Sequence, residues 1–238
     1  MKNDVQNRKK WFKNLKKILK VFIKKPEHLY LGDKIDQPSL ILSNHVGASG
    51  PLNIELYLDT PLRLWGTYEM NSGLKSVYKY LSYIYFHKKK HWNLFWSKLF
   101  CLIAAPLLNL FYKGLRLIPS YPDGRLRSTL NLGVETLQKG ESVVIFPEDS
   151  SNGYFTTLTK FYSGFLLFAD VCHKKGVDVP IYVTYFRKKE KTLVIDKPVL
   201  YSDLLKQNKS RDEIASEFLQ RCNQLGSMPL HELTQQTA

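Results

Sequence analysis

Cysteine and acidic residues are both scarce in this sequence. The 238 residues include 3 cysteines, Cys101, Cys172 and Cys222, which lie far apart and form no Cys-x-x-Cys pair. Disulfide or metal chemistry is therefore not expected, and a reducing compartment fits this cysteine usage. The 21 acidic residues are outnumbered by 35 lysines and arginines, which gives a formal net charge of +14. Such a charge predicts an anionic partner: a nucleic acid, an anionic membrane face or a phosphorylated substrate.

Long unbroken apolar runs are also absent. The main uncharged apolar run, residues 99–112, has about 14 residues, fewer than the roughly 17 to 25 that a spanning helix needs, and it contains Pro106. We expect this run to form a buried or interfacial hairpin anchored by Trp92, Trp96 and nearby lysines. The basic N-terminus lacks the unbroken apolar core of a signal peptide, which argues against secretion.

The first 26 residues are predicted to form a basic amphipathic helix that ends at Pro26. Apolar residues recur at intervals of three and four, and lysines fall largely on the opposite face. This pattern is typical of a helix lying on an anionic bilayer, and the alternative is a helix packed on the domain with a solvated basic face. The expected membrane-contacting residues are Trp11, Phe12, Leu15, Lys16, Ile18, Leu19, Phe22, Trp92 and Trp96.

Strand and helix patterns alternate along most of the remaining chain, which predicts an α/β fold with a mainly parallel central sheet flanked by helices. We expect an α/β domain over residues 27–205, with an apolar interfacial insertion at about 74–113, and a C-terminal helix and tail over 206–238. The expected strands are residues 40–42, 62–67, 114–119, 142–146, 179–186 and 192–195, and the expected helices are 52–58, 125–138, 160–174 and 211–225.

His45 follows the first of these strands directly. A histidine at the carboxyl end of a strand lies at the sheet edge where α/β proteins bind ligands and present catalytic side chains. Taken alone, it is also consistent with a hydrogen-bonded loop histidine.

Four blocks of the sequence resemble the 1-acyl-glycerol-3-phosphate acyltransferase family, over about residues 38–200. They occur in the family's order: Asn44-His45 with Pro51-Leu52, then Gly114 to Pro119, then Phe146-Pro147-Glu148, then Val179-Pro180-Ile181; Phe161 and Gly164 add a supporting match.

The resemblance implies an O-acyltransferase at the cytoplasmic face of a membrane, peripheral or monotopic, with no cofactor or metal. It would transfer a fatty acyl group from acyl-CoA or acyl carrier protein to a lysophospholipid-like acceptor such as lysophosphatidate. His45 would be the general base, because a neutral imidazole suits that role at cytoplasmic pH. Developing negative charge would be stabilised by loop donors at Asn44, Gly47 and Gly50.

The first block departs from the family at Gly50, where the family has the aspartate that orients the histidine. Asp149 stands where the third block has glycine, and it, or else Glu148, is a candidate partner of His45. The alternative is that Asp149 caps a turn. The family's phosphate-binding arginines are also missing, so either other residues replace them or the acceptor differs. Candidate acceptor or phosphate-binding residues are Arg116, Arg125, Arg127, Ser150 and Lys160.

The sequence motivates two rival functions. Gly50 motivates a catalytically inactive relative that binds lipid or a partner protein. The positive charge motivates a nucleic-acid-binding domain, but the chain has no zinc pattern, RNP-like strand or basic zipper region, so no nucleic-acid partner is expected.

Overall fold

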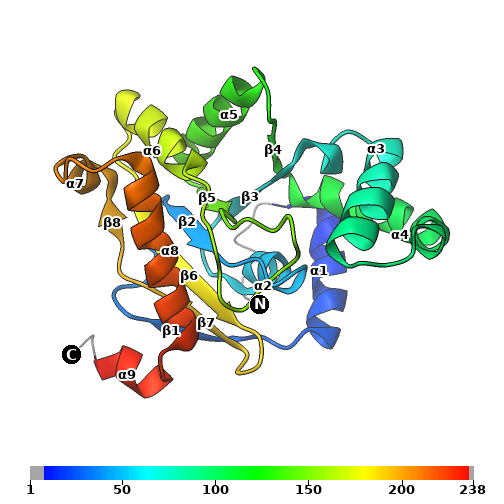
Figure 1. The fold of residues 1–238 in the computed structure, drawn as a ribbon, viewed down its shortest axis with the longest axis horizontal. Helices are drawn as coiled ribbons and strands as arrows, with labels where there is room; N and C mark the ends of the chain where they lie inside the picture. The colour runs from blue at the N-terminus through cyan, green and yellow to red at the C-terminus, as the bar shows by residue number, and fades with distance from the viewer. Residues whose placement is uncertain (1–7, 236–238) are drawn as a thin grey trace.

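A computed structural model of the chain describes residues 8–235. Its centre is an eight-stranded sheet in the order β1-β7-β6-β2-β5-β3-β4, with β8 paired to β6 (Figure 1). Strands β6, β2, β5, β3 and β4 are parallel, whereas β7 and β8 run antiparallel to β6. The predicted α/β class with a mainly parallel sheet flanked by helices is therefore confirmed.

The strands are β1 (Glu27–Tyr30), β2 (Leu40–Ser43), β3 (Leu62–Thr67), β4 (Ile118–Ser120), β5 (Ser142–Ile145), β6 (Pro180–Arg187), β7 (Thr192–Ile195) and β8 (Val199–Leu200). The helices are α1 (Lys10–Phe22), α2 (Ser49–Tyr57), α3 (Leu74–Lys79), α4 (Leu94–Leu115), α5 (Leu126–Gln138), α6 (Gly164–Lys174), α7 (Tyr201–Leu205), α8 (Arg211–Ser227) and α9 (Leu230–Gln235), with a 3-10 turn η1 (Tyr68–Met70) and a π-helix η2 (Tyr80–Lys89).

Strand β2 lies in the middle of the sheet and is buried on both faces. Because side chains alternate along a strand, Leu40 and Leu42 join the core under α5, α6 and α8, whereas Ile41 joins the core under α2. Figure 1 shows α5, α6 and α8 gathered over the sheet. Burial on both sides fixes the end of β2, and hence the loop that follows it, in position.

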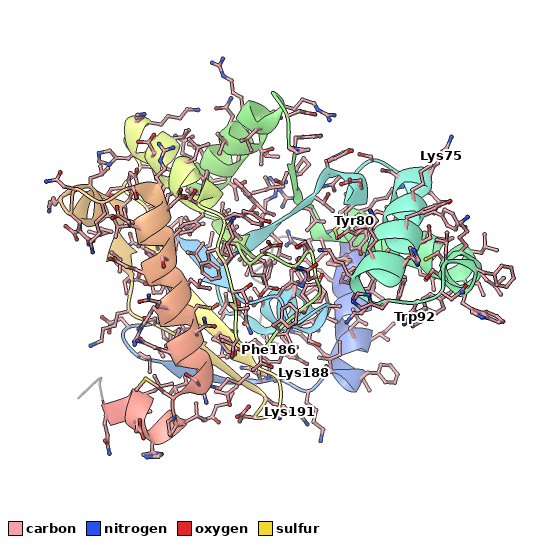
Figure 2. All side chains as sticks on the ribbon, in the orientation of Figure 1. Lys75, Tyr80, Trp92, Phe186, Lys188 and Lys191 are labelled. Atoms are coloured by element: carbon pink, nitrogen blue, oxygen red, sulfur yellow. The ribbon has the colours of Figure 1, made fainter. Side chains whose placement is uncertain are left out.

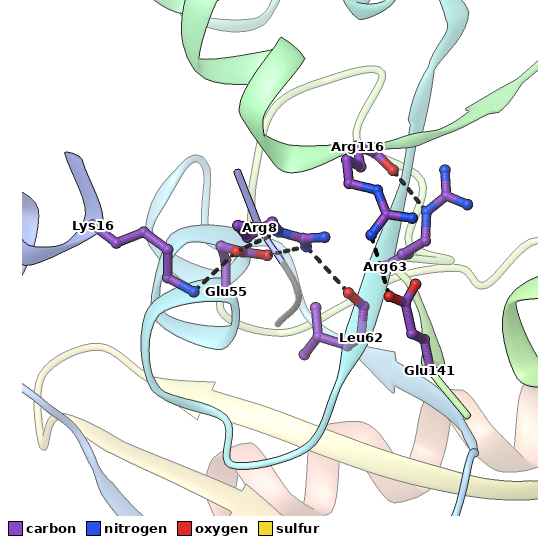
Figure 3. A network of polar contacts seen from close by, with 7 residues as sticks. All are labelled: Arg8, Lys16, Glu55, Leu62, Arg63, Arg116 and Glu141. Atoms are coloured by element: carbon purple, nitrogen blue, oxygen red, sulfur yellow. Dashed lines mark hydrogen bonds and ion pairs between the residues drawn. The ribbon is translucent and has the colours of Figure 1, made fainter. Parts of the chain in front are cut away.

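Helix α1 is attached to the α/β domain by a buried side chain and a buried ion cluster. Phe12 is fully buried, and a side chain at Gly114 would collide with its ring. The Glu55 carboxylate accepts from Arg8 at 2.7 Å and from Lys16 at 3.1 Å (Figure 3). Phe12 and Lys16 were predicted to contact a membrane; this is wrong, because both face the protein.

Helix α3, the π-helix η2 and α4 form a helical hairpin, residues 74–115, that projects from one side of the sheet (Figure 1). The prediction that residues 99–112 turn back on themselves is wrong, because the whole run lies within the continuous helix α4, Pro106 included. Pro106 is tolerated on the exposed side while Cys101 and Ala105 on the other side pack against Val77 and Leu81.

Helix α4 extends into a predicted strand and is both long and apolar. The strand predicted at residues 114–119 is shorter, because α4 continues to Leu115 and β4 begins only at Ile118. Within the described part of the chain, α4 is the one helix long and apolar enough, by length and composition, to cross a membrane.

Candidate active site

The candidate site is built on the loop that joins β2 to α2, at the carboxyl edge of the parallel strands. Val46 and Gly47 both adopt left-handed backbone angles, with φ of 45° and 66°. Two successive left-handed residues turn the chain sharply into α2. His45 precedes this turn, and its ring lies beside Phe146, at the end of β5, with 4.9 Å between ring centroids. Adjacent strands thus bring the first and third sequence blocks together.

The His45 ring is enclosed by aromatic side chains and by its own loop. Tyr154 stacks on it with ring centroids 4.8 Å apart and an interplanar angle of 29°. The ring nitrogen Nδ1 is hydrogen-bonded to the Gly47 carbonyl. A carbonyl oxygen can only accept, so Nδ1 carries the hydrogen and Nε2 is the basic nitrogen of the neutral ring. The pKa of His45 is lowered to about 4, mainly by burial and to a smaller extent by the charges of Lys89 and Lys90, against the opposing effect of the hydrogen bond to Gly47.

The loop leaves no room for the acid that the resemblance would place at Gly50. A side-chain carbon there would lie 2.6 Å from the His45 carbonyl oxygen and 2.7 Å from the Asn44 carbonyl oxygen. The Gly50 N–H donates to the His45 carbonyl at 3.1 Å. Glycine is therefore required by the geometry of this loop, and the Gly47 carbonyl makes the hydrogen bond to Nδ1 that an aspartate makes in a triad.

Glu148 is the carboxylate that lies beside the His45 loop. It is buried, it accepts a hydrogen bond from the His45 backbone N–H, and its Oε1 atom has no partner among residues 8–235. Burial raises the pKa of Glu148 to about 7, against the opposing effects of the His45 N–H and of Lys89. A carboxyl group that is half protonated near neutral pH, with an unpaired oxygen, is equipped to hydrogen-bond a polar substrate group.

Asp149 points elsewhere. Its carboxylate accepts from the Ser151 backbone N–H at 3.0 Å, and hydrogen bonds to Ser151 lower its pKa. No hydrogen bond or ion pair joins Asp149 to His45 in the part of the chain that the structure describes. The geometry corresponds to the turn-capping alternative and not to an acid that orients the imidazole.

Two lysines of the helical hairpin reach the site, and sequence reasoning missed their position. Lys89 donates to the Ser150 hydroxyl at 2.7 Å, and its ammonium lies 5.5 Å from the Tyr154 ring centre. The Lys90 ammonium lies 5.4 Å from the same ring, and a side chain at Gly47 would lie 3.7 Å from it. The sequence shows these lysines only within a basic cluster at residues 87–91. Tyr154 carries no sequence signal of its own.

The predicted phosphate-binding residues lie in different places. Arg116 pairs with Glu141, immediately before β5, so it lies at the opposite edge of the sheet from His45. Arg125 pairs with Asp123 and lies over the Tyr68 and Tyr121 rings. Arg127 and Lys160 are exposed. Of this set, only Ser150 is joined to a residue beside His45, through its hydrogen bond with Lys89.

The three predicted oxyanion donors, Asn44, Gly47 and Gly50, differ in whether their donor groups are already hydrogen-bonded. The Asn44 side chain is occupied by the Phe186 backbone on β6 (Phe186 is labelled in Figure 2), with bonds of 3.2 and 2.7 Å that tie two strands together. The Gly50 N–H is occupied within the loop. The Gly47 N–H makes no backbone hydrogen bond among residues 8–235. Across those residues, no three His, Cys, Asp or Glu side chains lie close enough together to hold a metal ion.

The fold of this chain has a counterpart among solved protein structures. The structure is similar to that of PlsC, the 1-acyl-sn-glycerophosphate (LPA) acyltransferase from Thermotoga maritima, with a TM-score of 0.53 and 13% sequence identity. The alignment covers 92% of this chain and 80% of that chain. At this identity the likeness establishes a shared fold. Comparison with protein-family models and with curated protein sequences gives no match.

Proposed function

We propose that this protein is a glycerolipid O-acyltransferase that moves a fatty acyl group from a thioester, acyl-CoA or acyl carrier protein, to a hydroxyl of a lysophospholipid such as lysophosphatidate. The observation that carries the proposal is the position of His45. The hydrogen bond between Nδ1 and the Gly47 carbonyl leaves Nε2 as the basic nitrogen of this histidine. The residue lies at the sheet edge, beside Phe146-Pro147-Glu148, in a fold shared with an LPA acyltransferase.

His45 is assigned the role of general base. As the acceptor oxygen attacks the thioester carbon, its proton passes to Nε2 of His45, the carbon–sulfur bond breaks and the thiolate leaves. A thiolate is stable enough to leave without a strong acid, since a thiol has a pKa of about 8.5. The Gly47 N–H is the donor we assign to the developing negative charge on the thioester oxygen.

The acceptor phosphate is assigned to Lys89 and Lys90. They replace by charge the arginines that the third and second blocks lack, and the Ser150 hydroxyl fixes Lys89 beside Glu148. Lysine binds phosphate as a compact point charge, so this site would accept a phosphate monoester with less geometric discrimination than an arginine fork. The same proposal places the protein at a membrane, which the exposed α1 residues Trp11, Ile18 and Phe22 would contact.

A second candidate function is lipid binding without turnover. The observation that favours it is that, among residues 8–235, no carboxylate is hydrogen-bonded to the His45 ring, whose Nδ1 is bonded to the Gly47 carbonyl, and that the Tyr154 ring stacks on the imidazole. Without an acid partner, the imidazolium formed during catalysis is stabilised only by a neutral carbonyl.

One experiment separates the two. Purified protein is mixed with vesicles of phosphatidylcholine and phosphatidylglycerol that contain lysophosphatidate, and acyl-CoA or acyl carrier protein carrying a labelled acyl chain is added. The acyltransferase proposal predicts labelled phosphatidate and free thiol in equal amounts. Lysophosphatidate binding without product, for every donor and chain length tested, would establish the second candidate instead.

A further inference from the structure

The outer side of α4 is an unpartnered apolar surface that runs along most of the helix. Its large side chains recur at intervals of three and four residues, so they share one face. Phe95 is 67% exposed and Ile103 is 74% exposed, values expected of lysine or glutamate on a soluble helix. The members of this surface, here called the α4 face, are Phe95, Trp96, Leu99, Phe100, Leu102, Ile103, Leu107 and Leu110.

The α4 face also contains a shallow hollow. Trp92, Trp96, Leu99, Phe100, Leu102 and Ile103 line a cavity of about 410 Å³ beside the turn between η2 and α4. Figure 2 places Trp92 at this turn, on the outer side of the molecule. A contiguous apolar surface of this kind marks a protein or membrane contact. Tryptophan is enriched where an apolar surface meets the polar boundary of a bilayer.

The charge around the α4 face selects an anionic lipid surface over an apolar protein groove. The helical hairpin, residues 74–115, contains no aspartate or glutamate. Its cations are seven lysines: Lys75, Lys79, Lys88, Lys89, Lys90, Lys98 and Lys113. Each lysine near an anionic leaflet contributes on the order of 1 kcal/mol. An apolar helix face within a purely cationic element is the combination that binds such a leaflet.

The packing of α4 determines how it can sit in a bilayer. Its inner side is buried along the whole length, with Cys101 and Ala105 against α3 and η2 and Gly114 against Phe12 of α1. A spanning orientation would require all of these contacts to separate. The helix therefore has one free face and one packed face, which suits a position parallel to the membrane plane.

We propose that α4, although long enough to span a bilayer, lies flat in the headgroup region of an anionic leaflet and inserts its outer face. Lys89 and Lys90, at the end of η2 in the same hairpin, then hold the candidate site next to that leaflet. This deepens the proposed function, which needs lipid substrates, but it concerns docking and is measured without turnover.

The test is sedimentation of the full chain with vesicles of equimolar phosphatidylcholine and phosphatidylglycerol. Replacing three members of the α4 face, Phe95→Ser, Ile103→Ser and Leu107→Ser, should weaken binding by at least ~10-fold, since each large apolar side chain inserted adds to the affinity. The matched control replaces three exposed apolar residues at the other end of the molecule, Val199→Ser, Leu200→Ser and Leu205→Ser, and should bind like the parent chain. Equal binding by both variants would overturn the proposal.

A second measurement separates a flat helix from a spanning one. Spin labels placed singly through Phe95→Cys, Ile103→Cys and Leu110→Cys report depth in the same vesicles, and the three native cysteines are buried. A flat helix places all three labels at one shallow depth. A middle label that is much deeper than the other two would show a spanning helix. Because neither readout involves acyl transfer, an inactive protein that docks this way would refute only the proposed function.

Discussion

The Tyr154 ring stacks on the His45 ring at a centroid distance of 4.8 Å. This contact removes water from the imidazole, and burial is the main cause of its low pKa, about 4. Tyr154→Ala should therefore raise the pKa of His45 toward its ordinary value of about 6.5, by roughly one unit. The ring proton shifts of His45 in an NMR pH titration measure this directly. Tyr154→Phe keeps the ring and should leave the pKa low; an unchanged value in Tyr154→Ala would show that the stacking does not control it.

Lys89 and Lys90 should determine the preference for phosphorylated acceptors. Replacing both by methionine removes two charge-assisted contacts and should lower kcat/KM for lysophosphatidate by about 10- to 100-fold. The value for a monoacylglycerol, which has no phosphate, should change little. Lys88→Met removes an exposed neighbouring charge and is the control. A parallel loss with both acceptors would remove these lysines from phosphate recognition.

Gly50 should not tolerate the family's aspartate. A side chain there meets the Asn44 and His45 carbonyl oxygens at less than 3 Å, so Gly50→Ala should lower the free energy of unfolding by about 1–3 kcal/mol, and Gly50→Asp by more. Chemical denaturation measures both. Gly124→Ala introduces a side chain into open space and should stay within about 0.5 kcal/mol of the parent. A stable Gly50→Asp protein with higher activity would contradict this account of the loop.

Glu148 should make stability fall as the pH rises. Its pKa in the folded protein is about 7, above the unfolded value near 4.5, so the folded state binds more protons between these values. Glu148→Gln should therefore gain stability relative to the parent chain as the pH goes from 4.5 to 7, by at most ~3 kcal/mol.

The comparison at each pH is made between variant and parent, because His45 contributes with the opposite sign. Its folded pKa lies below the unfolded value, so its contribution rises with pH between about 4 and 6.5. Glu135→Gln, at an exposed position of α5, is the matched control for exchanging glutamate for glutamine. A Glu148→Gln difference that stays constant between pH 4.5 and 7 would mean that this carboxyl ionises normally.

The sheet could be predicted because β2, β3, β5 and β6 are short apolar runs bounded by polar or turn residues. Strand β1 was not predicted, because Glu27–Tyr30 is a short edge strand with an irregular pattern. Pro106 misled the prediction at α4, since a proline on the exposed side of a helix can be accommodated when the other side is packed.

The site could be predicted only in part, because some of its residues are brought together by tertiary packing and not by a local sequence pattern. His45 and Glu148 follow strands, and strand ends meet at one sheet edge, so sequence order could place them together. Lys89 and Lys90 reach His45 from the projecting hairpin, and Tyr154 reaches it from a long loop. No local sequence pattern encodes where the hairpin and the loop lie. The choice between Asp149 and a backbone carbonyl as partner depended on atomic positions within one turn.

The most direct test of the central claim is the rate of acyl transfer to lysophosphatidate by the parent chain and by His45→Ala and Asp149→Asn. If His45 is the base and the Gly47 carbonyl orients it, His45→Ala should lose about 10²- to 10⁴-fold in kcat, while Asp149→Asn stays within about threefold of the parent. Full activity in His45→Ala, or an equal loss in Asp149→Asn, would contradict the account.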